Sequence, residues 1–388
     1  MDDLLQERIY FKEQVEVLRR KLNKSKENGI LEENFKSELK ELSDLEDKIL
    51  TALVPYYRGK DNFTTFINIE DTLEIKNIKN NSSIRKTYFI DEKLYLVNTL
   101  EGGIYFLNIN RLKDETIEIN WSSPLEKIKE KVVWAKKIEK DKMVLFTAKN
   151  KIYLFKSNKF KNTLEFAENL KLGAVYNFNI SKCIALNENF YVVEDGYGKL
   201  NLLEFKDEEV LKVFETDAFN CTAMAYVDEN TFALGTDEGK LFLIEVSNGE
   251  FKIIRKEEIF SGKVRNLTLL EDEKGFKDKL MILGDEGKLK IVSLKESSIK
   301  SYSLKGNLFY GVSKEGTAIV LSEDGIMYLF EENFGQWSLN EKNIYEDLFF
   351  TDLLQFENSK YLAVDLDNNF KLIDVKRIRT AEDLWSRS

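Results

Sequence analysis

The sequence has 388 residues, a hydrophobic fraction of 43% and an aromatic fraction of 12%, which is enough apolar material for a large buried core. The formal net charge of −10 disfavours binding to nucleic-acid phosphates or to an acidic membrane surface, because both require a basic face. The chain has no histidine, which excludes Ser-His-Asp and Cys-His catalysis and histidine-ligated metals.

The two cysteines, Cys183 and Cys221, are isolated in the sequence and predict neither a disulfide framework nor a zinc cluster. The first residues lack the basic and apolar segments of a signal peptide, and no apolar stretch is long enough to cross a bilayer. We therefore expect a cytoplasmic protein that has no membrane segment.

Residues 1–54 show the period of amphipathic helices, in two stripes separated near Gly29. Basic residues before Gly29 and acidic residues after it fit a helix end and a new helix start, so we expect a helical hairpin or coiled coil. Its predicted interface consists of Leu4, Phe11, Val15, Leu18, Leu22, Phe35, Leu39, Leu42, Ile49 and Leu53.

Two helices alone cannot bury these apolar stripes, so the hairpin should pack on a second copy of the chain or on a partner. The alternative is that it docks on its own following domain. Residues 55–61, beginning with Pro55, are expected to be a linker.

From residue 62 to 388 a different pattern recurs seven times: an apolar strand, a polar turn, and a second strand rich in Leu, Ile, Phe and Tyr. The turns recur about every 44 residues, which is the spacing of four-stranded propeller blades. Glycine or asparagine stands in each turn because a tight hairpin requires positive φ. The turn positions are Gly103, Asn150, Gly198, Gly239, Gly287, Gly325 and Asn369.

Apolar segments before and after each hairpin complete four strands per unit, so the predicted fold class is mostly β, a seven-bladed β-propeller. An unclosed ring would expose sheet edges. The segments 63–69 and 72–75 precede the first full unit and could complete the last blade, and we expect this amino-terminal strand to close the ring.

The turns 237–241 and 285–289, both with the sequence Asp-Glu-Gly-Lys-Leu, resemble those of WD-repeat and quinoprotein-like propellers. This resemblance covers residues 62–388 and implies the propeller fold. The sequence departs from WD repeats because it has no Gly-His and no Trp-Asp dipeptide. Helices followed by seven blades are also similar in layout to the heterotrimeric G-protein beta subunits.

No motif in the sequence predicts a catalytic, cofactor-binding or metal-binding site. The four tryptophans do not occupy matching repeat positions, and there is no phosphate-binding glycine loop. The oxygen-rich segment 365–369 falls on a hairpin turn and lacks the other ligands of a calcium loop.

The loops that lead into the blades should surround the central channel on one side of the propeller, and they supply a candidate partner-binding face. The alternative is that about half of these residues only pack between blades. The predicted face consists of Trp134, Asn179, Asn220, Lys263, Arg265, Asn266, Phe309, Tyr310, Phe349, Phe350 and Asp352.

The leading functional hypothesis is a non-catalytic scaffold: the propeller binds a protein partner, and the helices mediate self-association or partner assembly. One alternative is a propeller enzyme that uses carboxylates or a bound cofactor. The other is a nucleotide- or nucleic-acid-sensing subunit of a bacterial defence or regulatory complex, although the acidity of the chain makes nucleic acid a poor partner.

Overall fold

The structure is a computed structural model, and it describes residues 63–69, 75–77, 83–91, 93–112, 116–139, 142–156, 170–175, 179–206, 209–272, 274–333, 336–344, 350–357, 360–365 and 370–379. The predicted helical hairpin, its ten interface residues and the linker lie outside these ranges. The described regular elements are all β-strands, which confirms the mostly β part of the predicted fold class.

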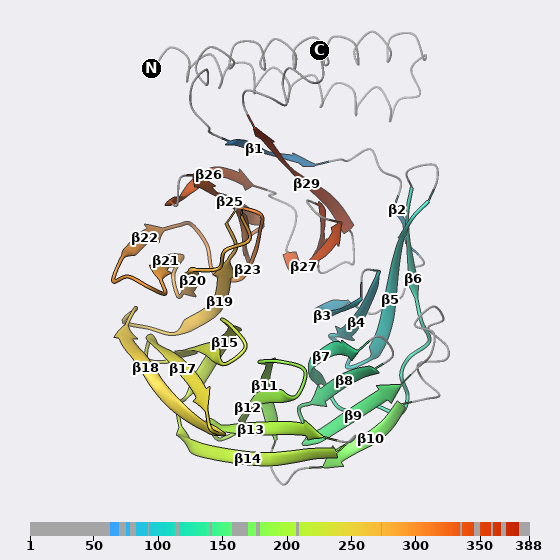
Figure 1. The fold of residues 1–388 in the computed structure, drawn as a ribbon. Helices are drawn as coiled ribbons and strands as arrows, with labels where there is room; N and C mark the ends of the chain where they lie inside the picture. Colours follow the sequence, from blue (N-terminus) through green and yellow to red (C-terminus); the bar gives the residue numbers. More distant parts are fainter. Residues whose placement is uncertain are drawn as a thin grey trace, which may run out of the picture. The chain divides into compact units, whose positions relative to one another are not determined.

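Seven sheets, antiparallel except for one strand pair in the first, form seven blades, which are numbered here in chain order. The first strand of each blade lies at the centre of the assembly in Figure 1, and the other strands follow outwards. The first strands are β3 (Ile84–Asp91), β7 (Val132–Glu139), β11 (Ile180–Ala185), β15 (Cys221–Tyr226), β19 (Val264–Leu270), β23 (Leu308–Lys314) and β27 (Phe350–Glu357).

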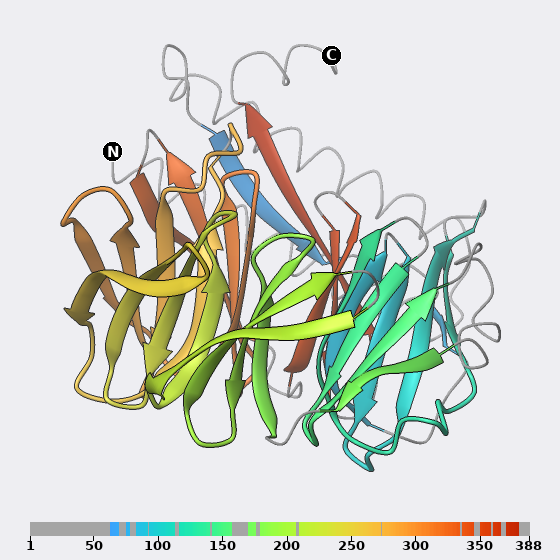
Figure 2. The ribbon, with the colours of Figure 1, turned by 60° about the horizontal axis from the view of Figure 1, so that its bottom comes forward.

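The second and third strands of each blade form the predicted hairpins. The second strands are β4 (Leu94–Thr99), β8 (Lys142–Thr147), β12 (Phe190–Asp195), β16 (Thr231–Thr236), β20 (Lys279–Gly284), β24 (Thr317–Ser322) and β28 (Lys360–Asp365). The third strands are β5 (Ile104–Arg111), β9 (Lys151–Lys156), β13 (Lys199–Lys206), β17 (Lys240–Ser247), β21 (Lys288–Ser293), β25 (Ile326–Asn333) and β29 (Phe370–Arg379). Figure 2 shows the strands of each blade side by side.

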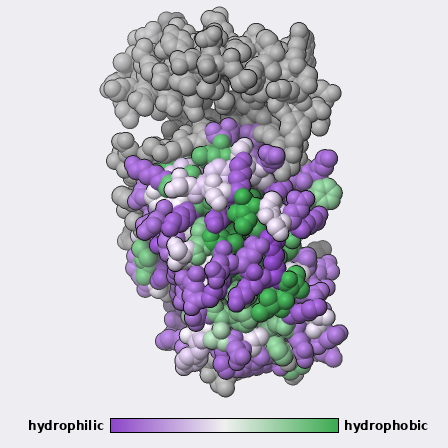
Figure 3. All heavy atoms as spheres, turned by 90° about the vertical axis from the view of Figure 1, so that its left-hand side faces the viewer, coloured by the Kyte–Doolittle hydropathy of each residue, from purple (hydrophilic) through white to green (hydrophobic). Residues whose placement is uncertain are grey.

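The outer strands complete the sheets, and two of them, β18 and β22, are largely exposed. Figure 3 shows apolar side chains among the hydrophilic ones on one side of the protein, and Ile253, Ile254 and Ile299 of β18 and β22 are each about half exposed. The outer strands of blades 1 to 6 are β6 (Ile117–Trp121), β10 (Leu170–Val175), β14 (Glu209–Ala218), β18 (Glu250–Glu258), β22 (Ile299–Ser303) and β26 (Gln336–Ile344).

The last blade takes its fourth strand from the amino-terminal side of the chain. β1 (Phe63–Ile69) lies next to β29, in the sheet order β1-β29-β28-β27. The segment that we expected to follow β1 into this blade behaves differently: β2 (Ile75–Asn77) pairs in parallel with β6 and is the fifth strand of blade 1. The chain divides into two compact units. One is Ile67–Lys376, which contains the seven sheets. The other is Met1–Phe66 with Arg377–Ser388, of which only the ends of β1 and β29 are in the described ranges.

The second strands are buried almost without interruption, and this shows why the blades require one another. In β4 and β24 all six residues are buried, and in the other five second strands only the first residue is partly exposed. A sheet with both faces apolar must be covered on both sides.

Seven hydrophobic clusters provide this cover, and each combines side chains of two neighbouring blades. The cluster between blades 7 and 1 closes the ring, because Leu354, Leu362 and Val364 pack with Ile84 and Leu107. The core is therefore divided among the interfaces between blades, with none of it belonging to a single sheet.

Hairpin turns between the second and third strands have the predicted geometry in most blades. Asn150, Gly198, Gly239, Gly287 and Gly325 all have positive φ, whereas in blade 1 the positive φ is at Gly102, one residue before the predicted Gly103. The seventh predicted position, Asn369, lies outside the described residues.

A small polar side chain at the end of the second strand holds the turn in five blades, and the sequence analysis missed it. The side chain of residue i accepts a hydrogen bond from the backbone N–H of residue i+4 in five blades. The acceptors are Thr99, Thr147, Asp195, Thr236 and Ser322, and all five are buried. Blade 5 has Gly284 at this position.

Gly239 should be far less tolerant of substitution than a glycine with the same backbone geometry in open space. At φ +79°, a Cβ on Gly239 would lie 2.2 Å from the carbonyl oxygen of Phe260 and 2.4 Å from that of Gly262. Gly275 has φ +81° and no atom within 4 Å of such a Cβ. We expect Gly275→Ala to cost about 1 kcal/mol in urea unfolding, and Gly239→Ala at least about 3 kcal/mol. Equal losses would contradict the close approach at Gly239.

Candidate functional site

Every first strand begins with a β-bulge between its first and third residues, which is the feature that builds the channel lining. The pairing with the second strand shifts between Ile84 and Lys86 in blade 1 and between Val132 and Trp134 in blade 2, and the other five blades repeat this shift. A bulge redirects side chains and strengthens local twist. The sevenfold repetition therefore places a ring of redirected side chains at one end of the channel.

Side chains of one blade bind the backbone of the next blade near these bulges. The hydroxyl groups of Thr222 and Thr268 donate to the carbonyl oxygens of Val264 and Gly311, at 2.6 and 3.1 Å. The hydroxyl of Tyr88 donates to the carbonyl of Val132 at 2.9 Å. First strands have no sheet partner on their inner edge, so these bonds replace part of the missing ladder.

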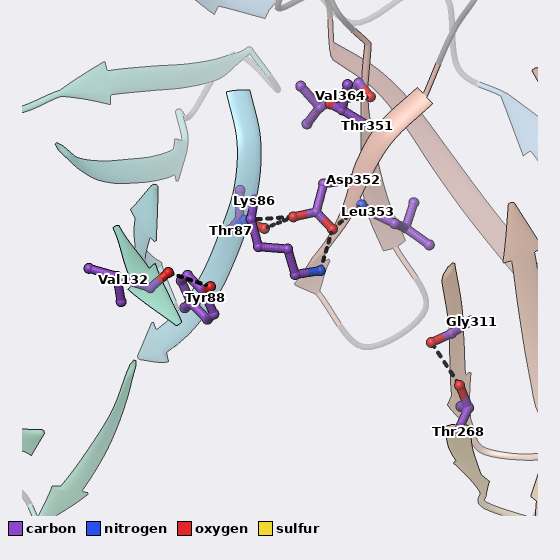
Figure 4. A network of polar contacts seen from close by, with 10 residues as sticks. All are labelled: Lys86, Thr87, Tyr88, Val132, Thr268, Gly311, Thr351, Asp352, Leu353 and Val364. Atoms are coloured by element: carbon purple, nitrogen blue, oxygen red, sulfur yellow. Dashed lines mark hydrogen bonds and ion pairs between the residues drawn. The ribbon is translucent and has the colours of Figure 1, made fainter. Parts of the chain in front are cut away.

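Asp352 makes the corresponding link between the last blade and the first (Figure 4). Its Oδ2 accepts hydrogen bonds from both the backbone N–H and the hydroxyl of Thr87, each at 2.6 Å, and its Oδ1 lies 3.3 Å from the Nζ of Lys86. The carboxylate is 1% exposed. A buried charge is stable only when it is paired and hydrogen-bonded, and Asp352 meets both conditions.

Lys86 joins three blades through this network. Its side chain leaves β3 in blade 1, pairs with Asp352 in blade 7, and places its Nζ 4.6 Å from the ring centre of Tyr310 in blade 6. The aromatic ring and the carboxylate both stabilise the ammonium group. Burial raises the pKa of Tyr310 above its usual value, so the phenol stays neutral.

A cavity of about 730 Å³ adjoins this network. Its volume lies within the range of ligand-binding sites. The walls come from the first strands of blades 1, 2 and 6 and from the turn after the first strand of blade 3. The lining residues are Lys86, Thr87, Tyr88, Phe89, Ile90, Trp134, Ala135, Lys136, Lys137, Glu188 and Tyr310.

The inner rim is basic, whereas the hairpin turns of blades 1, 4, 5 and 6 carry acidic residues. Among the first three residues of the seven first strands, Arg85, Lys86, Lys182 and Arg265 are basic and only Asp352 is acidic. Partial burial and, second to it, the charge of Arg85 lower the pKa of Lys131, which directly precedes β7.

The acidic turns lie at the same edge of the blades as this rim. The backbone N–H of Leu100 and of Glu323, both in such turns, donate to the carbonyls of Ser83 and Asn307, which directly precede first strands. Arg265 binds Asp285 of a turn at 2.6 Å, and this ion pair lowers the pKa of the carboxyl group. A nucleic acid bound across this edge would contact both the basic rim and the acidic turns.

The predicted partner-binding residues fall into three groups. Trp134 and Tyr310 line the cavity together. Asn179, Asn220 and Lys263 are exposed and directly precede first strands. The others in the described ranges are engaged within the propeller: Arg265 is held by Asp285, Asn266 lies beside Thr268, and Phe309 packs on the cluster between blades 6 and 7.

Two predicted residues are buried, as the alternative of packing between blades expects for part of the set. Phe350 is 6% exposed and belongs to the cluster between blades 6 and 7, and Asp352 is 1% exposed. The bulge at the start of β27 sets which side chains point inwards, and a sequence pattern does not reveal it. Phe349 lies outside the described residues.

Sequence reasoning named only Trp134 and Tyr310 among the cavity residues, and those it missed include Lys86, Phe89, Lys136 and Lys137. No segment leading into blade 1 was considered, although Arg85 and Lys86 stand at the start of β3. Lys136 and Lys137 lie deep in β7, beyond the loop in which binding residues were sought.

Chemically reactive groups do not gather in the part of the chain that the structure describes. It contains no group of three or more Cys, Asp or Glu side chains placed to hold a metal ion. Cys183 and Cys221 are both free and buried, and burial raises the pKa of each thiol. No helix in the described ranges is long and apolar enough to span a bilayer.

Comparison with known proteins identifies the fold and nothing finer. No protein-family model matches the sequence, and no curated protein matches it. The beta-propeller domain of Myceliophteria thermophila Cps50 (Swd1) is similar in structure, with a TM-score of 0.56 and 12% identity, over 79% of this chain and 99% of that one. The computationally designed Ika8 protein has a TM-score of 0.55 and 12% identity, over 77% of this chain and 98% of that one. The similarity to the Swd1 domain supports a β-propeller.

Removing the charge of Asp352 should weaken the link between the first and last blades. Asp352→Asn replaces an acceptor oxygen that binds two donors of Thr87, so we expect a loss of about 2 to 3 kcal/mol in the free energy of unfolding. Glu323→Gln is the control, because its pair with Arg265 is 3.8 Å long and exposed, and it should cost less than about 1 kcal/mol. Similar losses in urea unfolding would contradict the role of Asp352.

Glu194 should make the protein less stable as the pH rises. Burial raises its pKa from 4.5 to about 7, with Lys182 at 3.6 Å compensating only in part. The folded state therefore binds the proton more tightly than the unfolded state, and stability falls between about pH 4.5 and 7. Glu194→Gln should flatten this decline in thermal unfolding, whereas Glu286→Gln, at an 82% exposed side chain, should leave it unchanged. An undiminished decline in Glu194→Gln would show that another group causes it.

Proposed function

We propose that this protein is a non-catalytic interaction scaffold whose propeller binds a segment of a partner protein at the channel cavity. The observation that carries the proposal is the convergence of Phe89, Trp134 and Tyr310 with lysine side chains on one cavity of about 730 Å³. Aromatic side chains that are rigid and partly exposed are typical of interface hot spots.

The absence of histidine from the whole sequence supports a binding role over acid–base catalysis near neutral pH. The acidic turns around the basic rim favour a narrow ligand over a long nucleic acid, which needs a continuous basic surface. The proposal also includes assembly through a coiled coil of residues 1–54, for which the support is the apolar periodicity of their sequence.

Phe89 provides the sharpest test of the propeller's role, because it is 54% exposed and its removal should disturb the fold little. Phe89→Ala should reduce, by about tenfold or more, the recovery of partners captured from the native cell by the full-length protein. Phe276→Ala, at a 63% exposed position away from the cavity, is the matched control and should retain them. Equal recovery with both variants would contradict a binding role for the cavity.

The role of the helices is tested by comparing the full-length protein with a shortened chain that begins at Gly59. Partners or copies of the chain that are lost only from the shortened form should bind through residues 1–58. If the shortened form keeps both its partners and its mass in analytical ultracentrifugation, assembly through the helices is wrong.

A further inference from the structure

Apolar side chains remain exposed where the outer strands of blades 3 and 4 meet. Phe214 of β14 and Phe251 of β18 join the two blades, with their ring centres 5.6 Å apart, and both are partly exposed. Leu211 in β14 and Ile253 in β18 are each about half exposed, and so is Ile254, the extra residue of a bulge in β18. These five residues are called the blade 3–4 patch. On the side of the protein that carries β18, apolar side chains gather among hydrophilic ones (Figure 3).

Strand registers place Leu211 and Ile253 on the two sides of one seam. Leu211 pairs with Glu204, which lies two residues from Leu202 and therefore on the same face of the sheet. Leu202 packs in the cluster between blades 3 and 4. Ile253 pairs with Ile244 of blade 4, which belongs to the same cluster. Leu211 therefore faces blade 4, and Ile253 faces blade 3.

Basic side chains close the next two seams at the equivalent position. The residue opposite the fourth residue of the third strand is Phe214 in blade 3, Arg255 in blade 4 and Lys300 in blade 5. Arg255 donates to the carbonyl oxygen of Ser293 in blade 5 at 2.6 Å. Lys300 donates to the carbonyl oxygen of Trp337 in blade 6 at 2.8 Å. Phe214 cannot form such a bond, so the seam between blades 3 and 4 keeps an apolar rim.

Charged side chains of both signs border the patch. Glu204 lies on the face of blade 3 that packs on blade 4, and Lys256 lies on the opposing face of blade 4, because it pairs with Phe242 of the shared cluster. Glu204 is the sixth residue of β13 and Phe242 is the third of β17, so the two charges lie about 10 Å apart along the strand direction. Among the described residues, neither Glu204 nor Lys256 forms an ion pair.

This arrangement is complementary to itself. A two-fold axis through the apolar centre would bring Glu204 of one copy to Lys256 of the other, and the reverse pair would form at the same time. A border of one sign would instead favour a partner of the opposite sign. Apolar patches with a polar border are typical of protein interfaces. We propose that the blade 3–4 patch is an interface between two copies of this chain, with apolar side chains at its centre and a Glu204–Lys256 ion pair on each side.

Analytical ultracentrifugation of the full-length protein tests this interface. The mass of the wild type should rise as its concentration increases from about 1 to 100 μM. Leu211→Asp places a charge at the centre of the patch and should raise the dissociation constant by about tenfold or more. The matched control is Leu339→Asp, because Leu339 is 37% exposed, Leu211 is 46% exposed, and both lie in outer strands. The control should change the constant by less than about twofold.

Two results of this experiment would overturn the proposal. One is a wild type that stays monomeric up to about 100 μM. The other is an equal effect of Leu211→Asp and Leu339→Asp. Association through residues 1–58 is common to all the variants, so the comparison isolates the patch. Circular dichroism of each variant verifies that it is folded.

Exchange of the two charges tests the two-fold arrangement. Glu204→Lys and Lys256→Glu should each weaken the association by about fivefold or more, since each variant places like charges opposite one another twice. The double variant restores opposite charges, and its dissociation constant should return to within about twofold of the wild type. A double variant that associates more weakly than either single variant would overturn the proposed pairing of two copies.

The interface between copies goes beyond the proposed partner site and can fail independently of it. The blade 3–4 patch lies on outer strands, whereas the cavity is lined by inner strands. If Leu211→Asp leaves the mass unchanged while Phe89→Ala loses captured partners, the interface between copies is wrong and the scaffold function stands.

Discussion

The structure depends on one constraint: a four-stranded sheet whose second strand is buried on both faces cannot be stable alone. In this chain the second strands are buried almost end to end, and the seven hydrophobic clusters each draw on two blades. Every blade therefore needs both neighbours, and the ring must close. The cluster that joins Leu354 and Leu362 to Ile84 and Leu107 meets that need between the last blade and the first.

Closure also explains the polar chemistry of the channel. The inner strands have an unpaired edge, and side chains of the preceding blade bind that edge at Val132, Val264 and Gly311. At the junction of blades 7 and 1, the buried carboxylate of Asp352 accepts hydrogen bonds from the backbone N–H and the hydroxyl of Thr87. Its negative charge brings Lys86 across the junction, and Lys86 in turn contributes to the cavity. The candidate site is thus a consequence of how the ring is joined.

The sequence predicted the features that repeat and missed those that depend on local geometry. Positive φ at Asn150 and Gly239 follows from the residue type, and regular spacing of such turns predicts the blades. The side chains of Thr99 and Ser322 each accept a hydrogen bond from the backbone N–H four residues later. Both are recognisable in the sequence as small polar residues, but the turns were predicted from glycine and asparagine alone. The pairing of β2 with blade 1 depends on tertiary contacts that its short sequence does not encode.

The candidate site was predicted in part, for a physical reason. Trp134 and Tyr310 were expected at the channel and do line the cavity, whereas Phe350 and Asp352 are buried. A bulge at the head of each inner strand changes which side chains point into the channel, and no residue type requires that bulge. Lys136 and Lys137 were missed because they lie well inside a strand, where an alternating pattern indicates packing alone.

Ring closure is tested most directly by a double-mutant cycle across the junction of the first and last blades. The variants Thr87→Val, Asp352→Asn and their combination are compared in urea unfolding. Since the hydroxyl of Thr87 lies 2.6 Å from the carboxylate of Asp352, a closed ring predicts a coupling energy of about 1 kcal/mol or more. Strictly additive losses would contradict closure through this contact and, with it, the account of the channel.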